Sequence, residues 1–375
     1  MKNISILIKP ASSLCNLRCK YCFYANVSDL REVKCYGIMS IETSKKLIDN
    51  VFSELYDEDT INIGFQGGEP TMAGISFFKD FIEYVKTKNQ NVQVNYFIQT
   101  NGTYINPEWC EFLRKNNFLV GLSLDGYDEN HNLNRLNDKK MFTFNRVMST
   151  KRMFDKFGVE YNVLTVLTER LSNHAKEVFD FLIKENIKYL QLIPCLDDLN
   201  VKKKGEHALT PKGFYKFYKE LLPLWKNEFE NGNYISIKLF DDIFNLFVNG
   251  QVNACGLAGS CSIQFVIESD GSVYPCDFYA LDKYLLGNIT KNKLSEMYSS
   301  SVAYEFINSR PISLLNEKCK SCKYFNMCRG GCKRMANSMY VDEKGFCGYE
   351  SVLDIFVPNV ENILRIFDSK YSKML

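Results

Sequence analysis

Short apolar segments alternate with amphipathic segments through the first 195 residues, and this alternation limits the folds that the chain can adopt. The apolar segments, such as INIGFQ at residues 61–66, are typical of buried strands. The intervening segments, such as ISFFKDFIEYVKTK at residues 75–88, carry apolar residues at helical spacing. The β-α unit recurs six times. This pattern predicts an α/β fold with a helix-covered parallel sheet, whose functional residues lie at the carboxyl ends of its strands.

The remaining predictions of secondary structure follow the same periodicities. We expect strands at residues 4–10, 61–66, 92–100, 118–125, 160–168 and 188–194. We expect helices at residues 43–56, 75–88, 107–117, 143–158, 172–186 (with Ser172 as N-cap), 211–229 and 241–250. Residues 196–210 are polar and predict a loop, and residues 265–276 predict a hairpin with an Asp-Gly turn. The tail at residues 349–371 is predicted to be helical apart from Pro358.

Cysteine is the residue type whose use is unusual. The chain of 375 residues contains 14 cysteines and only three histidines. Three cysteines lie within residues 15–22 and eight lie between residues 255 and 347. In a large chain without a secretory signal, clustered cysteines indicate metal binding rather than disulfides. An almost pure thiolate set suits iron–sulfur clusters or zinc.

Charge and hydropathy exclude several classes of function. The net charge is +2 and there is no long block of like charge, so the sequence does not indicate binding to nucleic acid or to an anionic membrane surface. The longest apolar runs are too short to span a membrane. The N-terminus has no cleavage signature after a long apolar region. We therefore expect a cytoplasmic protein that binds neither nucleic acid nor a membrane.

Residues 15–22, CNLRCKYC, follow the first predicted strand and supply three thiols. Three thiolates bind three irons of a [4Fe–4S] cube and leave the fourth iron open to a small molecule, which suits chemistry rather than plain electron transfer. An incomplete zinc site is the alternative. The segment resembles the CxxxCxxC signature of the radical S-adenosylmethionine enzymes. The resemblance implies that Cys15, Cys19 and Cys22 hold a cluster whose open iron binds the methionyl amine and carboxylate of S-adenosylmethionine.

Residues 65–70, FQGGEP, end the second predicted strand. Two glycines let the backbone approach a ligand closely, and a carboxylate accepts hydrogen bonds from an ammonium group. A plain glycine turn before a proline is the alternative. Placed one strand after CNLRCKYC, the segment resembles the GGE motif of the same family. By that resemblance Gln66, Gly67, Gly68 and Glu69 bind the cofactor, with Glu69 at its amine.

Further polar residues follow the third and fourth predicted strands. Residues 99–101 end the third strand, and LSLDG at residues 122–126 ends the fourth. Ser123 and Asp125 resemble the family's ribose-contacting positions, and an Asp-Gly turn is the alternative. Arg135 is a candidate partner of the cofactor carboxylate, and the alternative is a surface arginine.

The eight later cysteines make two sets of four. CxxC with further cysteines nearby is a strong metal signal, and a zinc ribbon is the runner-up. The arrangement resembles the SPASM extension of radical S-adenosylmethionine enzymes, which carries two auxiliary [4Fe–4S] clusters. The resemblance, and not the spacing, assigns the two sets as Cys255, Cys261, Cys276 and Cys332, and as Cys319, Cys322, Cys328 and Cys347.

A narrower resemblance covers nearly the whole chain. Segments such as YGIMS, IQTNGT, HNLNR and CSIQFVIESDGSVYPCDFYALDKYLLGNI occur in order and are similar to those of the anaerobic sulfatase-maturating enzymes. This implies a partial (β/α)6 barrel with a C-terminal cysteine-rich, SPASM-like iron–sulfur domain. We expect the barrel and a connecting helix at residues 1–235, the second domain at residues 236–350, and a C-terminal helix at residues 351–375.

The family oxidises a cysteine or serine of a sulfatase to Cα-formylglycine. A 5′-deoxyadenosyl radical removes a hydrogen atom from Cβ, and the thiol or hydroxyl loses a proton, which calls for a positioned base. By resemblance Asp277 is that base and Tyr24 positions the substrate or assists proton movement. The alternatives are a hydrogen-bonding aspartate and a buried tyrosine that packs beside the cluster.

The same resemblance implies the cofactors and partners. The cofactors are three [4Fe–4S] clusters and S-adenosylmethionine, and the second electron leaves through an auxiliary cluster. The partners are an unfolded sulfatase segment of the type C/S-x-P-x-R and an electron donor such as flavodoxin or ferredoxin. The alternatives are an enzyme that modifies another peptide, for example by thioether crosslinking, a non-catalytic iron–sulfur electron carrier, and a zinc-binding interaction protein.

Three cysteines remain outside the clusters. Cys110 lies on a predicted helix and is expected to be a small core residue. Cys35 is expected in a loop. Cys195 follows the sixth predicted strand, where a residue of the barrel mouth would lie.

Overall fold

The computed structural model describes residues 2–88, 91–200, 204–251 and 254–370. They form two compact units, which are described separately. The first unit holds the described residues of Met1–Ser123, Asn132–Tyr161 and Ser262–Ser309, and the second holds those of Leu124–His131, Asn162–Cys261 and Arg310–Leu375. The boundaries that we predict from the sequence for the domains stay a prediction.

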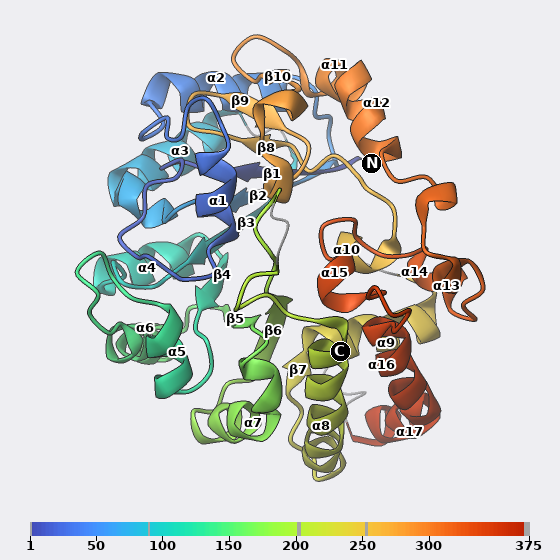
Figure 1. Cartoon of the computed structure of the whole chain (residues 1–375). Helices are drawn as coiled ribbons and strands as arrows, with labels where there is room; N and C mark the ends of the chain where they lie inside the picture. Colours follow the sequence, from blue (N-terminus) through green and yellow to red (C-terminus); the bar gives the residue numbers. More distant parts are fainter. Residues whose placement is uncertain (1, 89–90, 201–203, 252–253, 371–375) are drawn as a thin grey trace. The chain divides into compact units, whose positions relative to one another are not determined.

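The sheet of the first unit contains four parallel strands in chain order, as the alternating pattern predicts. They are β1 (Asn3–Ile8), β2 (Thr60–Phe65), β3 (Gln93–Thr100) and β4 (Phe118–Ser123). Helices α2, α3 and α4 lie on one side of these strands (Figure 1). The apolar side chains of the strands, such as Ile61, Ile63 and Phe65, are buried.

The helices of the first unit follow its strands. The α-helices are α1 (Phe23–Asp29), α2 (Ile41–Phe52), α3 (Ile75–Lys88), α4 (Pro107–Lys115), α6 (Phe144–Phe157), α11 (Leu294–Tyr298) and α12 (Ser301–Asn308). The 3-10 turns are η1 (Pro70–Ala73), η3 (Asp277–Tyr279) and η4 (Asp282–Tyr284). Helix α5 (Asp128–Asn134) spans the boundary between the two units.

A hairpin from late in the sequence extends the sheet beside β1. Strand β8 (Val266–Ile267) pairs in parallel with β1, and β9 (Ser272–Tyr274) and β10 (Gly287–Asn288) follow as antiparallel strands. The predicted hairpin is therefore confirmed, and Gly271 occupies its turn with φ +89°. Because Ile8 is in register with Phe65 of β2 and with Ile267 of β8, the residues that follow these three strands meet at one edge of the sheet.

The second unit combines three parallel strands with helices. The strands are β5 (Tyr161–Leu167), β6 (Tyr189–Pro194) and β7 (Ser236–Ile237). The α-helices are α7 (Ala175–Lys184), α8 (Pro211–Glu230), α9 (Lys238–Asn249), α10 (Cys255–Ala258), α13 (Glu317–Lys320), α14 (Phe325–Cys328), α15 (Ala336–Met339), α16 (Gly348–Phe356) and α17 (Val360–Lys370). The 3-10 turns are η2 (Leu171–Asn173), η5 (Ile312–Leu314) and η6 (Val357–Asn359). Aromatic rings join α8, α9 and α16, since Trp225 and Phe240 lie 5.1 Å apart and Phe240 stacks on Phe356 at 5.2 Å.

Most predicted elements are confirmed within a few residues, including the helical tail with its interruption at Pro358. Residue 371 of that prediction lies outside the described residues, as do residues 201–203 of the predicted loop. The predicted cap of the helix at residues 172–186 is wrong. Ser172 lies in η2, its hydroxyl donates to the Glu169 carbonyl at 2.7 Å, and α7 begins after His174. A local serine hydrogen bond has competed with the capping geometry.

No helix in the described part of the chain is long and apolar enough to cross a membrane.

Candidate active site

The three clustered cysteines lie in the loop between β1 and α1. Cys22 is exposed, and Cys15 and Cys19 are partly buried. Backbone bonds from Arg18 to Leu136 (2.7 Å) and from Lys20 to Asn134 (3.1 Å) fix the loop against a second segment of the same unit. The sequence predicts this location, at the carboxyl end of the first strand.

The thiols fit a site for a cationic cluster. Burial, with the nearby Glu69 carboxylate and the other two thiols adding to it, raises the pKa of Cys15 to about 12. A thiolate at this position is therefore stable only beside a positive centre, which cluster iron supplies. Each of the 14 cysteines is a thiol and not half of a disulfide. In the described part of the chain, no group of three or more His, Cys, Asp or Glu side chains is placed so that it could hold a metal ion.

Two buried side chains donate toward cysteine sulfurs of this loop. The Asn101 amide nitrogen lies 3.9 Å from Cys15 Sγ, and Arg135 Nη1 lies 3.9 Å from Cys19 Sγ. Arg135 is buried, so the alternative of a surface arginine is wrong. Its proposed contact with a cofactor carboxylate stays a prediction. Hydrogen bonds to the sulfurs of an iron–sulfur cluster adjust its reduction potential. Asn101 and Arg135 are placed to have this effect on a cluster bound by the thiols.

Gly67 and Gly68 pack against the loop that carries the cysteines. A Cβ on Gly67, whose φ is +142°, would lie 2.8 Å from the Ser12 carbonyl oxygen, and one on Gly68 would lie 2.1 Å from that of Leu14. Two backbone hydrogen bonds join the same two loops. The N–H of Gly68 donates to the Ser12 carbonyl at 2.8 Å, and the N–H of Glu69 donates to the Leu14 carbonyl at 2.7 Å. The structure thus adds a reason for the two glycines, which is close contact with the cysteine loop.

Replacing Gly68 with alanine is expected to lower the melting temperature and to weaken binding of S-adenosylmethionine. The added Cβ collides with the Leu14 backbone, and overpacking of this kind costs about 1–3 kcal/mol. Thermal unfolding and equilibrium binding measure the two effects. Gly64→Ala is the matched control, because its Cβ meets only the end of the Leu7 side chain at 3.0 Å and a carbonyl at 3.7 Å. Equal stability and affinity of the two variants would contradict this assignment.

Glu69 is buried in a nest of donors. Its Oε1 accepts from Thr71 N (3.1 Å), Thr71 Oγ1 (2.6 Å) and Thr100 Oγ1 (2.7 Å), and its Oε2 accepts from Asn101 N (2.7 Å). Burial raises the pKa of this carboxyl, while the hydrogen bonds oppose the rise. A carboxylate oxygen has lone pairs for about two donors, so Oε1, which three donors share, is saturated and Oε2, with one donor, is not. Oε2 therefore keeps a lone pair for a further donor such as an ammonium group.

The two candidate ribose contacts belong to different units. Ser123 is buried at the end of β4, in the first unit. Asp125 is buried in the second unit, where its Oδ1 accepts from Val166 N at 3.1 Å and its backbone N–H donates to His131 Nδ1 at 3.3 Å. Their joint contact with ribose stays a prediction.

Asp277 lies at the shared edge of β1, β2 and the hairpin. Its Oδ1 accepts from Lys9 Nζ at 2.5 Å, and its Oδ2 accepts from Gln66 Nε2 at 3.1 Å. Lys9 is completely buried, and the Asp277 side chain keeps 11% of its surface exposed. The structure therefore brings together the predicted base and Gln66, and it adds Lys9, which the sequence analysis missed. A lysine that follows the apolar run ISILI was the available signal.

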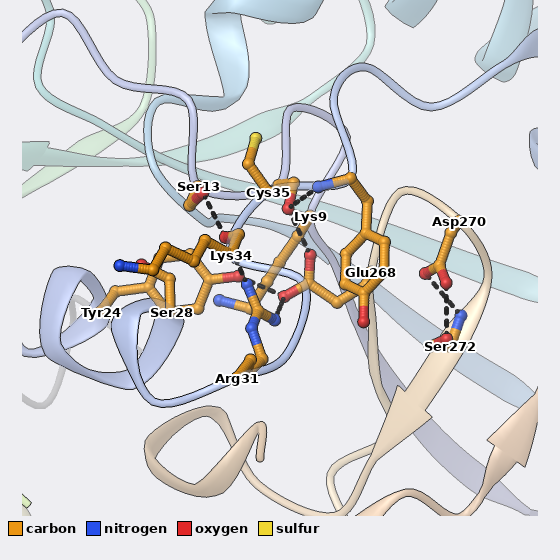
Figure 2. A network of polar contacts seen from close by, with 12 residues as sticks. Lys9, Ser13, Tyr24, Ser28, Arg31, Lys34, Cys35, Glu268, Asp270 and Ser272 are labelled. Atoms are coloured by element: carbon orange, nitrogen blue, oxygen red, sulfur yellow. Dashed lines mark hydrogen bonds and ion pairs between the residues drawn. The ribbon is translucent and has the colours of Figure 1, made fainter. Parts of the chain in front are cut away.

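Tyr24 joins Lys9 to a second buried ion pair. Lys9 Nζ lies 3.6 Å from the centre of the Tyr24 ring. The Tyr24 hydroxyl donates to Glu268 Oε1, which also accepts from Arg31 Nη1 at 2.6 Å. Burial first, and the Glu268 carboxylate next, raise the pKa of Tyr24 well above its usual value. Figure 2 shows the side chains of Tyr24, Arg31 and Glu268 meeting in this network.

Four cysteines of the second unit line one pocket. The cysteines are Cys319, Cys322, Cys328 and Cys347. Tyr324, Tyr340, Tyr349 and Glu350 line the same pocket. Burial, opposed by a backbone hydrogen bond and reinforced by neighbouring thiols and Glu350, raises the pKa of Cys347 to about 12. This is the set that the family resemblance predicts for one cluster. As in the first loop, buried thiolates here are stable only beside a positive centre such as cluster iron.

The other predicted set divides between the units. Cys255, Cys261 and Cys332 lie in the second unit, where Cys332 N donates to Gly256 at 3.0 Å. Burial, with Cys332 and Cys261 adding to it, raises the pKa of Cys255 to about 11. Cys276 lies in the first unit, next to Asp277. The joint cluster of these four cysteines stays a prediction.

The three remaining cysteines take the places expected of them locally. Cys110 is fully buried in α4, and Cys35 is exposed in a loop. Cys195 is buried after β6, and its backbone N–H donates to Leu167 at 3.0 Å. Burial, and then Asp125 and Asp197, raise the pKa of Cys195 to about 12.

Comparison with known proteins adds an independent observation. Residues 10–182 match the radical SAM superfamily, and residues 255–323 match the SPASM iron–sulfur cluster-binding domain. A cysteine-type anaerobic sulfatase-maturating enzyme of Clostridium novyi is 42% identical over 372 residues, covering 98% of each chain. A serine-type enzyme of Bacteroides thetaiotaomicron is 29% identical over 356 residues, covering 91% of this chain and 85% of the relative.

Solved structures agree with these matches. Native anSMEcpe with bound AdoMet superposes with a TM-score of 0.88 at 41% identity, covering 96% of this chain and 99% of that one. The same protein with bound AdoMet and Kp18Cys peptide gives a TM-score of 0.87 at 40% identity, with 97% and 99% covered. The predicted fold class, a partial (β/α)6 barrel with a C-terminal SPASM domain, is confirmed.

Proposed function

The chain belongs to the anaerobic sulfatase-maturating enzymes, and on that premise we propose that it oxidises a cysteine of a sulfatase to Cα-formylglycine. It is a radical S-adenosylmethionine oxidoreductase of this family. The observation that carries the choice of cysteine is the identity of 42% to a cysteine-type relative against 29% to a serine-type one.

Three cysteines and the glycine loop would hold the cofactors at the mouth of the barrel. Cys15, Cys19 and Cys22 supply three thiolates for a [4Fe–4S] cluster, and Oε2 of Glu69 keeps an acceptor position for the methionyl amine. When bound, the reduced cluster and S-adenosylmethionine supply the species that removes a hydrogen atom from Cβ of the target residue. Asn101 and Arg135 donate toward Cys15 and Cys19 and would stabilise their thiolates.

The remaining contacts to S-adenosylmethionine are proposed by resemblance. They come from Gln66, Gly67, Gly68, Ser123 and Asp125. Of these, Gln66 also donates to Asp277, so it would contact both the cofactor and the proposed base.

Asp277 would take the proton that the target thiol must lose. A base must lie within hydrogen-bond reach of that proton, and the partly exposed Asp277 carboxylate can receive a ligand. Lys9 and Gln66 donate to its two oxygens and fix its orientation. The target cysteine thus loses a hydrogen atom from Cβ, a proton from its thiol and one electron, and the product is a thioaldehyde. Water converts it to the aldehyde and releases hydrogen sulfide.

The eight later cysteines would hold two auxiliary [4Fe–4S] clusters, which would make three in all and would accept the remaining electron. The pocket lined by Cys319, Cys322, Cys328 and Cys347 supports one of them. Flavodoxin or ferredoxin is the class of electron donor that suits the first cluster. Thiolate clusters of this kind persist in a reducing compartment, which supports a cytoplasmic location.

The matches at residues 10–182 and 255–323 support the proposed division into a barrel at residues 1–235, a SPASM-like domain at residues 236–350 and a terminal helix at residues 351–375.

An anaerobic assay tests the proposal. Reconstituted protein, reductant and S-adenosylmethionine are incubated with two peptides that differ only in cysteine or serine within C/S-x-P-x-R, and mass spectrometry measures the aldehyde. We expect aldehyde from the cysteine peptide at the higher kcat/KM. Faster conversion of the serine peptide would overturn the cysteine assignment. Cofactor cleavage without any aldehyde would overturn the proposed substrate.

A further inference from the structure

Glu268 is a completely buried carboxylate that the sequence analysis did not single out. It follows β8, and its backbone is fixed by the hairpin, since Glu268 N donates to Ser272 at 2.9 Å and its carbonyl accepts from Gly271 at 2.9 Å. The side chain thus projects from a short turn whose geometry is set by Gly271. It lies nine positions before Asp277 in the chain.

The Glu268 carboxylate gathers donors from three other segments. Tyr24 comes from α1, Arg31 from the loop after it, and Ser12 from the loop before Cys15. Arg31 binds at 2.6 Å and Ser12 Oγ at 2.9 Å. The Arg31 side chain is completely buried, and its Nη2 also donates to the Lys34 carbonyl at 3.1 Å. Figure 2 shows Glu268 beside Tyr24 and Arg31.

Two buried ion pairs flank one phenol. Arg31 and Glu268 form one pair, Lys9 and Asp277 form the other, and Tyr24 connects them. Its hydroxyl binds Glu268, and its ring lies under the ammonium of Lys9 at 3.6 Å. A cation over an aromatic ring is attracted to it, most strongly where water is excluded. The position of the ring therefore determines where Lys9 is held, and Lys9 determines where Asp277 is held.

Stability alone does not account for this arrangement. Well-packed apolar residues usually match or exceed the stability of a buried ion pair. The contacts of the Arg31–Glu268 pair lead through Tyr24 and Lys9 to the candidate base. A network of this kind can hold a reacting group in place to within a fraction of an ångström, as catalysis requires.

We infer that Glu268, held by Arg31 and Ser12, is a positioning residue that fixes Tyr24 and, through Tyr24 and Lys9, the Asp277 carboxylate. This inference rests on the proposed function, because it acts on the base of that reaction. It assigns Tyr24 the role of a mechanical link between two charge pairs.

The test removes the buried pair without leaving a lone charge. The variant is Arg31→Met/Glu268→Leu, which replaces two ions with apolar side chains, a change that is often neutral or stabilising at a buried pair. We expect the kcat for aldehyde to fall about 10- to 100-fold, since small misplacements of a reacting group have effects of this size. The KM for peptide, the iron content and the yield of 5′-deoxyadenosine should stay within about twofold, so the aldehyde formed per deoxyadenosine falls.

Two further variants make the outcome decisive. Tyr24→Phe removes only the hydroxyl that Glu268 holds, and combining it with the paired variant should add little, because both break the same link. Asp270→Asn is the matched control in the same hairpin. Its exposed carboxylate accepts from Ser272, through N at 3.0 Å and Oγ at 2.7 Å, and the activity of the variant should equal that of the wild type.

The possible results separate this inference from the proposed function. If the paired variant forms as much aldehyde per 5′-deoxyadenosine as the wild type, the positioning role alone is overturned. If the paired variant does not fold, the same result in Tyr24→Phe overturns it. Fully additive effects also overturn it, because they place Glu268 and Tyr24 in separate functions. If the wild type forms no aldehyde, the proposed function fails, and the positioning role fails with it.

Discussion

Replacing Cys19 with alanine is expected to reduce cleavage of S-adenosylmethionine below detection. The loop would keep two thiolates for a cluster that requires three, and Arg135 would lose the sulfur to which it donates at 3.9 Å. With no competent cluster, neither 5′-deoxyadenosine nor aldehyde forms. Liquid chromatography of the reconstituted, reduced protein measures the nucleoside, and iron and sulfide analysis measures cluster content.

Cys35→Ala is the matched control for this change. Cys35 lies in the same unit, is exposed, and belongs to none of the three predicted cysteine sets. We expect its variant to cleave the cofactor and oxidise the peptide as the wild type does. Nucleoside formation by Cys19→Ala at the wild-type rate would remove this cysteine from the cluster.

Replacing Asp277 with asparagine is expected to lower the rate of aldehyde formation by about 10²- to 10⁴-fold, the range that a positioned base contributes. Asparagine keeps the size of the side chain and cannot accept the proton. Cleavage of S-adenosylmethionine should continue in part, because Cys15, Cys19 and Cys22 are unchanged. Parallel measurement of aldehyde and 5′-deoxyadenosine in single-turnover reactions separates the two effects.

The buried lysine makes a second variant necessary. Asp277→Asn leaves the ammonium of Lys9 without its partner at 2.5 Å, and an unpaired buried charge is strongly destabilising. In Lys9→Gln/Asp277→Asn both charges are absent, so stability should recover while the aldehyde does not. Asp282→Asn is the control for the chemical change, since its carboxylate is exposed and accepts from the backbone N–H of Glu32 at 2.9 Å. Recovery of aldehyde in the double variant would assign Asp277 to stability alone.

The parallel sheet could be predicted from the sequence because each strand is a short apolar run between amphipathic helices. Residues 61–66 and 75–88 coincide closely with β2 and α3. Local hydrogen bonds of single residues could not be predicted in the same way. Ser172 fits the pattern of an N-cap, and its hydroxyl instead binds the carbonyl of Glu169.

The cysteine loop and the glycine loop could be located from the sequence because each follows a strand. What holds them together could not be. Gly68 is required by the Leu14 carbonyl, which would lie 2.1 Å from a Cβ there. That contact depends on how two loops meet in three dimensions, and no spacing in the sequence encodes it.

The network of buried charges was the largest omission of the sequence analysis. Lys9 and Asp277 are 268 positions apart and meet because a two-residue strand, β8, pairs with β1. Such a short strand has no periodicity of its own. Glu268 resembles an ordinary polar residue before a turn, and only its burial and its partners reveal otherwise.

The proposed reaction depends on a cluster iron that no side chain of this protein binds. Electron–nuclear double resonance on the reduced, reconstituted protein with S-adenosylmethionine carrying ¹⁵N at its amine tests this directly. We predict hyperfine coupling between that nitrogen and the cluster in the wild type, and none in Cys19→Ala. Absence of coupling in wild-type protein with an intact cluster, or coupling to a fourth side-chain ligand in its place, would contradict the account.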